Sequence, residues 1–159
     1  KKIPFGILLL FGGGLTLASL IQKTGLSVWI GGQLGSLAIF PTIVIVLVMV
    51  LLVILITELT SNTATTATFL PIAGALAITL GEHPLMLVIP ATLAVSCAFM
   101  LPVATPPNAI VFSAGYLSQK DMTRVGFGLN VIGVIFVTLV AYTVMMWVFG
   151  IEPGVAPNL

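Results

Sequence analysis

A long apolar run that ends in a polar cluster is the feature that most limits how this chain can fold. Residues 40–56 are almost entirely Ile, Val, Leu and Met, and the polar segment TELTSNT follows at residues 57–63 before the chain turns apolar again. Charged residues make up only 6% of the chain, against about 25% in an ordinary soluble domain. We therefore predict an integral, multi-pass, all-α membrane protein whose helices are solvated by lipid.

The apolar regions can be measured against the roughly 20 residues that a helix needs to cross a bilayer. Residues 85–117 are too long for one straight crossing, and prolines near their middle remove backbone donors, so we predict a broken transmembrane helix there. The other predicted elements are a transmembrane helix at residues 5–22, an interfacial segment at 23–38, a helical hairpin at 41–81 and a last transmembrane helix at 125–149.

The few charges predict the orientation of these spans. Lys120 and Arg124 precede the last span and place that connection in the cytoplasm, because basic residues favour the inner side. Glu82 and Glu152 then lie on the outer side of a plasma (inner) membrane, and the C-terminus is external. Residues 41–81 fit either two full crossings or a re-entrant hairpin that enters and leaves on the outer side, and the charges do not distinguish these.

Two polar interruptions, at residues 57–63 and 102–108, are the candidate functional sites. Irregular backbone at membrane depth is tolerated only where it is buried in protein or lines a wet cavity. In transporters the exposed N–H groups of a half-helix attract an anion, and the freed carbonyls bind Na⁺ or H⁺. A simple helix cap explains the first interruption and a proline kink the second, but their joint occurrence favours a binding site.

Particular residues in each interruption fit such a site. Ser61, Asn62 and Thr63 stand where a new helix is predicted to begin, so they can cap it or donate to a carboxylate or sulfate. The residues before Pro106 are biased away from helix, which frees carbonyls such as that of Ala104 for a cation.

The remaining polar residues carry weaker hypotheses. Glu58 is a carboxylate near the membrane, either linked to proton or ion binding or merely solvated in an interfacial turn. His83 lies in a turn with Glu82 and is expected to be exposed to water. Cys97 is the single cysteine and lies in an apolar stretch, so we expect it to pack in the core as a small apolar side chain. The chain has no phosphate loop, metal-ligand spacing or nucleophile with a base, so we predict no enzyme, and its net charge of +1 gives no reason to expect nucleic acid as a partner.

The segments TELTSNTATTATFLPI and SCAFMLPVATPPNAIVF, with GILLLFGGGL upstream, closely resemble the C-terminal half of the divalent anion:sodium symporter family, the sodium-coupled di- and tricarboxylate transporters. The resemblance implies one repeat of an inverted-repeat secondary transporter with an outer re-entrant hairpin. It also implies a role for residues in both interruptions. Substrate would contact Ser61, Asn62, Thr63, Thr105 and Pro106, and Na⁺ would contact Thr57, Asn62 and the carbonyl of Ala104.

The resemblance further implies sodium-coupled symport of C4-dicarboxylates or citrate by an elevator-type mechanism, in a lipid-embedded homodimer with Na⁺ as the co-transported ion. Sulfate is an alternative substrate. Family members carry two inverted repeats and this sequence shows one, so we expect a fragment that lacks the N-terminal repeat. The rival hypotheses are a sodium/proton antiporter with Glu58 as the titrating group, and a membrane interaction module that transports nothing.

Overall fold

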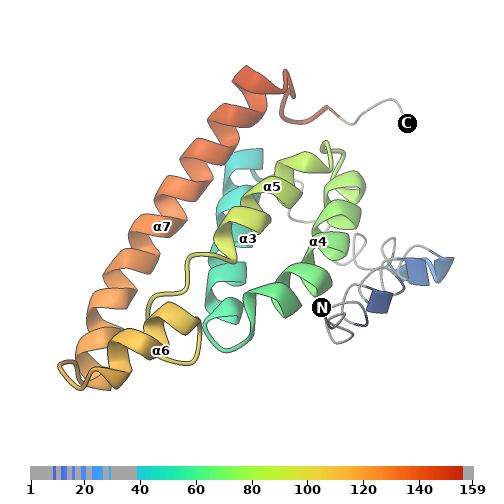
Figure 1. Ribbon diagram of the computed structural model, residues 1–159. Coiled ribbons are helices and arrows are strands. Elements are labelled where there is room, and N and C mark those ends of the chain that lie inside the picture. Colours follow the sequence, from blue (N-terminus) through green and yellow to red (C-terminus); the bar gives the residue numbers. More distant parts are fainter. Residues whose placement is uncertain are drawn as a thin grey trace.

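The computed structural model describes residues 39–155 together with residues 9, 12, 13, 16, 19, 20, 23–26 and 29. The helix predicted at 5–22 and the interfacial segment at 23–38 fall largely outside the described residues. The all-α prediction is confirmed for the described part, which contains helices and no strand. In chain order the helices are α3 (Thr42–Thr57), α4 (Asn62–Thr79), α5 (Leu85–Ala94), α6 (Pro106–Ser113) and α7 (Gln119–Val148) (Figure 1).

Helices α3 and α4 are joined by a turn at residues 58–61, and their far ends also meet. The Thr42 hydroxyl at the start of α3 donates to the carboxylate of Glu82, which follows α4. The two helices therefore form a hairpin with a polar tip at 58–61 and both feet at one end. Figure 1 shows the feet beside the end of α7 and the tip at the opposite end, beside α6.

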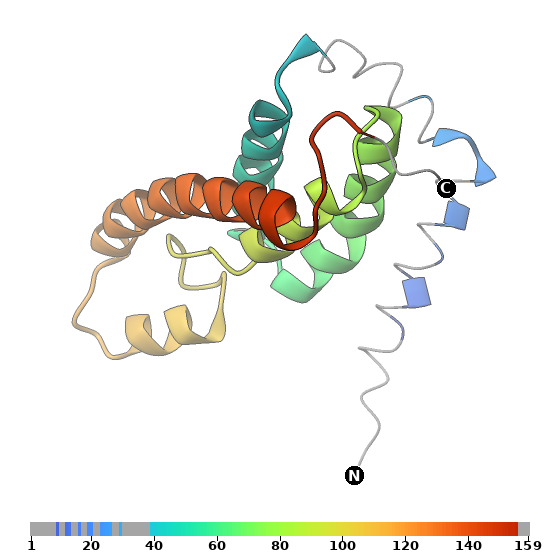
Figure 2. The ribbon, with the colours of Figure 1, turned by 90° about the horizontal axis from the view of Figure 1, so that it is seen from above.

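The core lies where α3, α5 and α7 pack together, with α4 covering α5. Val50 and Ile54 of α3 belong to one buried core with small residues of the neighbouring helices, among them Ala77 and Ala91, and all four are at most 1% exposed. Small residues let helix backbones approach closely, which is how helices pack when lipid offers no hydrophobic drive. Viewed from above in Figure 2, α3, α5 and α7 lie side by side and α4 lies beyond α5.

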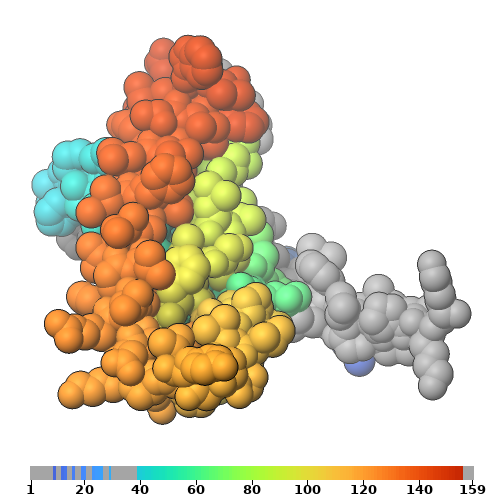
Figure 3. Space-filling model, turned by 60° about the vertical axis from the view of Figure 1, so that its left-hand side comes forward, coloured from blue at the N-terminus to red at the C-terminus, as the bar shows by residue number. Residues whose placement is uncertain are grey.

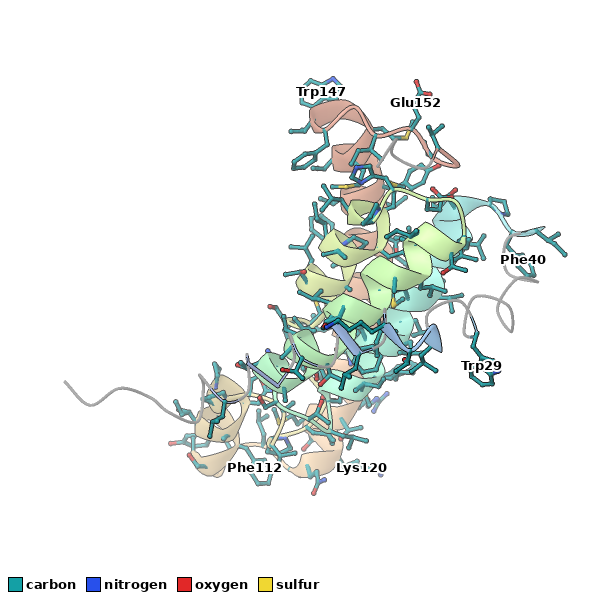
Figure 4. All side chains as sticks on the ribbon, turned by 90° about the vertical axis from the view of Figure 1, so that its right-hand side faces the viewer. Trp29, Phe40, Phe112, Lys120, Trp147 and Glu152 are labelled. Carbon is teal, nitrogen blue, oxygen red and sulfur yellow. The ribbon has the colours of Figure 1, made fainter. Side chains whose placement is uncertain are left out.

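Helix α7 is the one described helix that is both long and apolar enough to cross a membrane. Its 30 residues correspond to about 45 Å at 1.5 Å per residue. It begins at Gln119, earlier than the sequence predicted, because Ser118 and Asp121 form a capping box that fixes the first turn. Figure 4 shows Lys120 at one end of the molecule and Trp147 and Glu152 at the other.

Between α5 and α6 the chain is not helical. Helix α5 ends at Ala94, and α6 begins at Pro106, whose fixed φ and missing N–H suit the first position of a helix. Figure 3 shows α6 and the start of α7 together at the lower end of the molecule. This loop, residues 95–105, brings irregular backbone against the hairpin tip and α7.

Candidate functional site at the hairpin tip

Three oxygen atoms converge where α3 ends. The Thr57 hydroxyl oxygen lies 2.7 Å from the Asn62 side-chain oxygen and 3.2 Å from the carbonyl oxygen of Val95. Thr57 is fully buried, and its single hydroxyl hydrogen is available to only one of these two acceptors. The cluster therefore holds more acceptors than hydrogens, which is the chemistry that suits a small cation bound by neutral oxygens.

The start of α4 follows from local sequence. Ser61 has an extended backbone and its hydroxyl accepts from the Ala64 N–H at 3.3 Å, so it is the N-cap. Asn62 is the first helical residue. The turn is closed by Thr60 and Thr65, whose hydroxyl oxygens lie 2.6 Å apart. Ser61 and Thr63 remain exposed, so both present polar side chains on the open side of the tip.

The start of α6 mirrors that arrangement. Thr105 is the N-cap, and its hydroxyl accepts from the Asn108 N–H at 3.3 Å. Pro106 and Pro107 have no N–H, and the N–H of Asn108 is engaged with the Thr105 side chain, so these three residues give no helix hydrogen bond to the carbonyls before them. Ala104 is buried, and its carbonyl is one of those that receive no hydrogen bond from the first residues of α6.

Glu58 joins the two interruptions. One carboxylate oxygen accepts from the backbone N–H groups of Phe99 and Met100 at 2.8 and 2.9 Å, and the other from that of Leu101 at 3.1 Å. The side-chain amide of Asn130 on α7 donates to the first oxygen at 2.7 Å. Glu58 is only 4% exposed, so the interpretation of a solvated carboxylate is wrong.

The structure brings together some of the predicted site residues. Thr57 and Asn62 are in hydrogen-bond contact, and Glu58 binds the loop that leads to Ala104 and Thr105. Within residues 39–155, no hydrogen bond links the Asn62 side chain directly to Ala104 or Thr105. The polar groups of α4 and α6 thus lie at the same end of the molecule and share Glu58 as the link between their loops.

Sequence reasoning missed three residues that build this site. The Asn108 side-chain amide donates to the carbonyls of Ala98 and Leu101 at 2.8 and 3.0 Å, and so completes the loop. Asn130 holds Glu58, and Gly126 lets α7 approach the loop so closely that an added Cβ would lie 2.3 Å from a backbone oxygen. An amide inside an apolar span was a signal for Asn130, because such groups are costly in lipid without a partner.

One expectation about the feet of the hairpin needs correction. His83 is partly buried, and its Nδ1 accepts from the Leu85 N–H at 3.2 Å, so it is not a freely hydrated side chain. Glu82 is 4% exposed and also accepts from the Gly154 N–H at 2.8 Å. The tail after α7 thus reaches back to Glu82 at the feet of the hairpin.

A cavity in the described part lies away from the polar site. It has a volume of about 470 Å³, lies between α3 and α4, and is lined by apolar side chains such as Val48, Phe69 and Leu76. Because its lining is apolar, it offers neither donors for a carboxylate nor oxygen ligands for a cation.

Two capped helix starts beside irregular backbone, set in an apolar helical fold, are typical of membrane proteins with broken helices. Comparison with known proteins gives the family: the profile of the sodium:sulfate symporter transmembrane region matches residues 1–151. The chain therefore belongs to this family, the divalent anion:sodium symporters that its motifs predicted.

Several curated relatives have a more specific name. Sodium-dependent dicarboxylate transporter SdcS from Staphylococcus aureus, in strains USA300, NCTC 8325 / PS 47 and COL, is 51% identical to this chain over 152 residues. The match covers 96% of this chain and 29% of each relative. The chain thus spans less than a third of the length of the proteins that it matches.

Proposed function

We propose that this chain forms the hairpin, broken helix and last span of a sodium-coupled dicarboxylate symporter, and supplies part of its sodium and substrate site. The observation that carries the proposal is the oxygen cluster of Thr57, Asn62 and Val95, in which three oxygens share one hydroxyl hydrogen. Na⁺ is the co-transported ion that this cluster would bind. The name of the relatives supports dicarboxylate as the substrate, and the family description keeps sulfate as a second candidate.

The anion would lie against the two helix starts. Ser61, Asn62 and Thr63 open α4, and Thr105 and Pro106 open α6. Helix N-termini carry partial positive charge and unsatisfied N–H groups, which favour a carboxylate. Asn62 would serve both ligands, since its side-chain oxygen faces the cation cluster. The carbonyl of Ala104 would complete the sodium site when the loop closes on the tip, and the rest of the anion site would come from residues outside this chain.

The dimensions of the hairpin support a re-entrant arrangement. With 16 and 18 residues, α3 and α4 are about 24 and 27 Å long, which is shorter than the roughly 30 Å hydrocarbon core. Their feet meet through Thr42 and Glu82, and Glu82 also contacts Gly154 in the tail that follows α7. The tip binds Asn130, near the middle of α7. The polar tip would then lie near the midplane, with the feet and the C-terminus outside and Lys120 in the cytoplasm (Figure 4).

The mechanism would be alternating access. Binding of Na⁺ between the tip and the loop would complete the anion site, so that substrate binds the sodium-loaded state better than the empty one. The rigid unit of α3, α4, α5 and α6 would then carry both ligands across the membrane as an elevator, within a homodimer. Each of these steps draws on the second, inverted repeat that the resemblance implies.

The test is uptake of labelled succinate by vesicles that contain the full-length protein, driven by an inward sodium gradient. Thr57→Val keeps the size of the side chain and removes the hydroxyl, so the sodium concentration for half-maximal uptake should rise about tenfold or more. Thr92→Val is the matched control, because the Thr92 hydroxyl is exposed and donates to the carbonyl of Val88 in its own helix. Asn62→Ala should abolish uptake.

Three outcomes separate the rivals. Unchanged sodium-driven uptake in Asn62→Ala would reject the site. Sodium-driven uptake of labelled sulfate but not of labelled succinate would make sulfate the substrate. Sodium-driven proton movement without an organic anion, lost in Glu58→Gln, would favour the antiporter; the structure gives this reading less support, since both oxygens of Glu58 are held by protein N–H groups.

A further inference from the structure

Glu58 occupies a position that its own helix does not favour. It is the C-cap of α3, where the helix dipole is negative and a carboxylate is disfavoured. It is also almost fully buried, and a buried charge persists only when its hydrogen bonds are satisfied. The four N–H donors come from residues more than forty positions away, so the reason for a glutamate here lies in the tertiary contact and not in α3.

The loop at residues 95–105 depends on that contact for its backbone. Its carbonyls at Ala98 and Leu101 accept from Asn108. The successive N–H groups of Phe99, Met100 and Leu101 all donate to Glu58. Successive N–H groups that converge on one anion form a nest, which fixes the backbone of the segment as a unit. Without the carboxylate these donors would be left bare at membrane depth, where each costs free energy.

The contact also joins the two halves of the proposed sodium site. Glu58 follows Thr57 directly in the chain, and the loop whose N–H groups it accepts from, residues 95–105, contains Ala104. Asn130 fixes the carboxylate from the side of α7. We propose that Glu58, held by Asn130, is a positioning residue that sets the sodium affinity by keeping the loop of Ala104 in register with Thr57 and Asn62. This inference rests on the proposed function and adds a residue that touches neither ligand.

Glu58→Gln tests the proposal in the full-length protein. Glutamine keeps the shape but places an NH₂ group against at least one of the three backbone donors, whichever way its amide is turned. The sodium concentration for half-maximal succinate uptake should rise about tenfold, as expected for the loss of a charged hydrogen bond, while the maximal rate at saturating sodium changes less than threefold. Glu82→Gln is the matched control: it is the same substitution at an equally buried glutamate at the feet of the hairpin, and it should leave the sodium dependence unchanged.

A second measurement does not depend on transport. Hydrogen exchange of the amides of residues 99–101 should accelerate at least tenfold in Glu58→Gln and stay unchanged in Glu82→Gln. If the wild type shows no sodium-driven uptake, the proposed function fails, and the exchange experiment still decides the role of Glu58. Should Glu58→Gln fail to fold, Asn130→Leu gives the same test with a smaller shift, about threefold, because the backbone donors keep their acceptor.

The proposal is overturned by either of two results. One is an equal change of sodium dependence in Glu58→Gln and Glu82→Gln, which would make the effect a general loss of stability. The other is a loss of maximal rate in Glu58→Gln with unchanged sodium dependence and unchanged exchange at residues 99–101.

Discussion

Replacing Gly126 by alanine is the sharpest test of how α7 meets the broken helix. A Cβ at this position would lie 2.3 Å from the carbonyl oxygen of Phe99, 2.5 Å from its carbonyl carbon and 2.7 Å from the Cα of Met100. All three atoms belong to the backbone, so no side-chain rotation relieves the clash. Ordinary contact begins at 3.4 Å, so loop and helix would have to separate by about 1.1 Å, the difference between 3.4 and 2.3 Å.

That separation has a calculable cost. Overpacking costs about 1–3 kcal/mol, and straining one hydrogen bond between the loop and the Glu58 carboxylate costs about 1.5–3 kcal/mol. Alanine returns about 1 kcal/mol because it is the better helix former. We expect Gly126→Ala to lose about 1.5–5 kcal/mol in free energy of unfolding and to raise the sodium concentration for half-maximal uptake.

Gly128→Ala on the same helix is the control, because the added Cβ would have no neighbouring atom within 4 Å. It should be neutral or stabilising by up to about 1 kcal/mol. The assay is thermal unfolding of the full-length protein in detergent, followed by sodium-driven uptake in vesicles. If Gly126→Ala unfolds at the wild-type temperature with unchanged sodium dependence, the close approach of α7 to the loop is refuted.

Two further substitutions test the loop and the start of α7. Asn108→Ala removes the amide that donates to the carbonyls of Ala98 and Leu101, and it should lower the free energy of unfolding by about 2–4 kcal/mol in thermal unfolding. Ser113→Ala on the same helix is the control, because its exposed hydroxyl donates only to a local carbonyl. It should change the free energy of unfolding by less than about 0.5 kcal/mol. Ser118→Ala removes the cap of α7 and should cost about 1 kcal/mol without changing the sodium dependence of uptake; an altered sodium dependence would mean that this helix end is coupled to the tip.

Local chemistry explains much of what the sequence predicted. Serine before a helix start accepts from an N–H group of the first turn, and this is what Ser61 does, as its place in the sequence predicted. Thr105 caps α6 in the same way, although that cap was not predicted from the sequence. Proline removes a donor wherever it stands, so Pro106 and Pro107 predicted from sequence alone that no helix runs through this region. The apolar runs place the chain in lipid for the same reason, since each side chain contributes its transfer free energy independently of its neighbours.

The links between elements were not predictable in this way. Glu58 and Asn130 are 72 positions apart, and so are Glu82 and Gly154. A carboxylate in an apolar sequence indicates that hydrogen-bond donors must lie beside it, but the sequence does not show which residues supply them. The sequence therefore left Glu58 either as a solvated group or as a titrating one, and missed its role in binding backbone.

What the sequence by itself determined is the solvent, the helical class and the approximate places of the two polar interruptions, because these depend on composition and on the backbone chemistry of single residues. The second interruption spans residues 95–105 and not 102–108, since the contacts of Glu58 and Asn108 hold the backbone of residues 98–101 outside a helix. What only the tertiary structure decided is which groups meet at the interruptions: Glu58 with the N–H groups of residues 99–101, Asn130 behind it, and Gly126 against the loop. The physical reason is that a buried hydrogen bond needs both partners within about 3 Å, and only the packing of α3, α5 and α7 brings these distant residues to that distance.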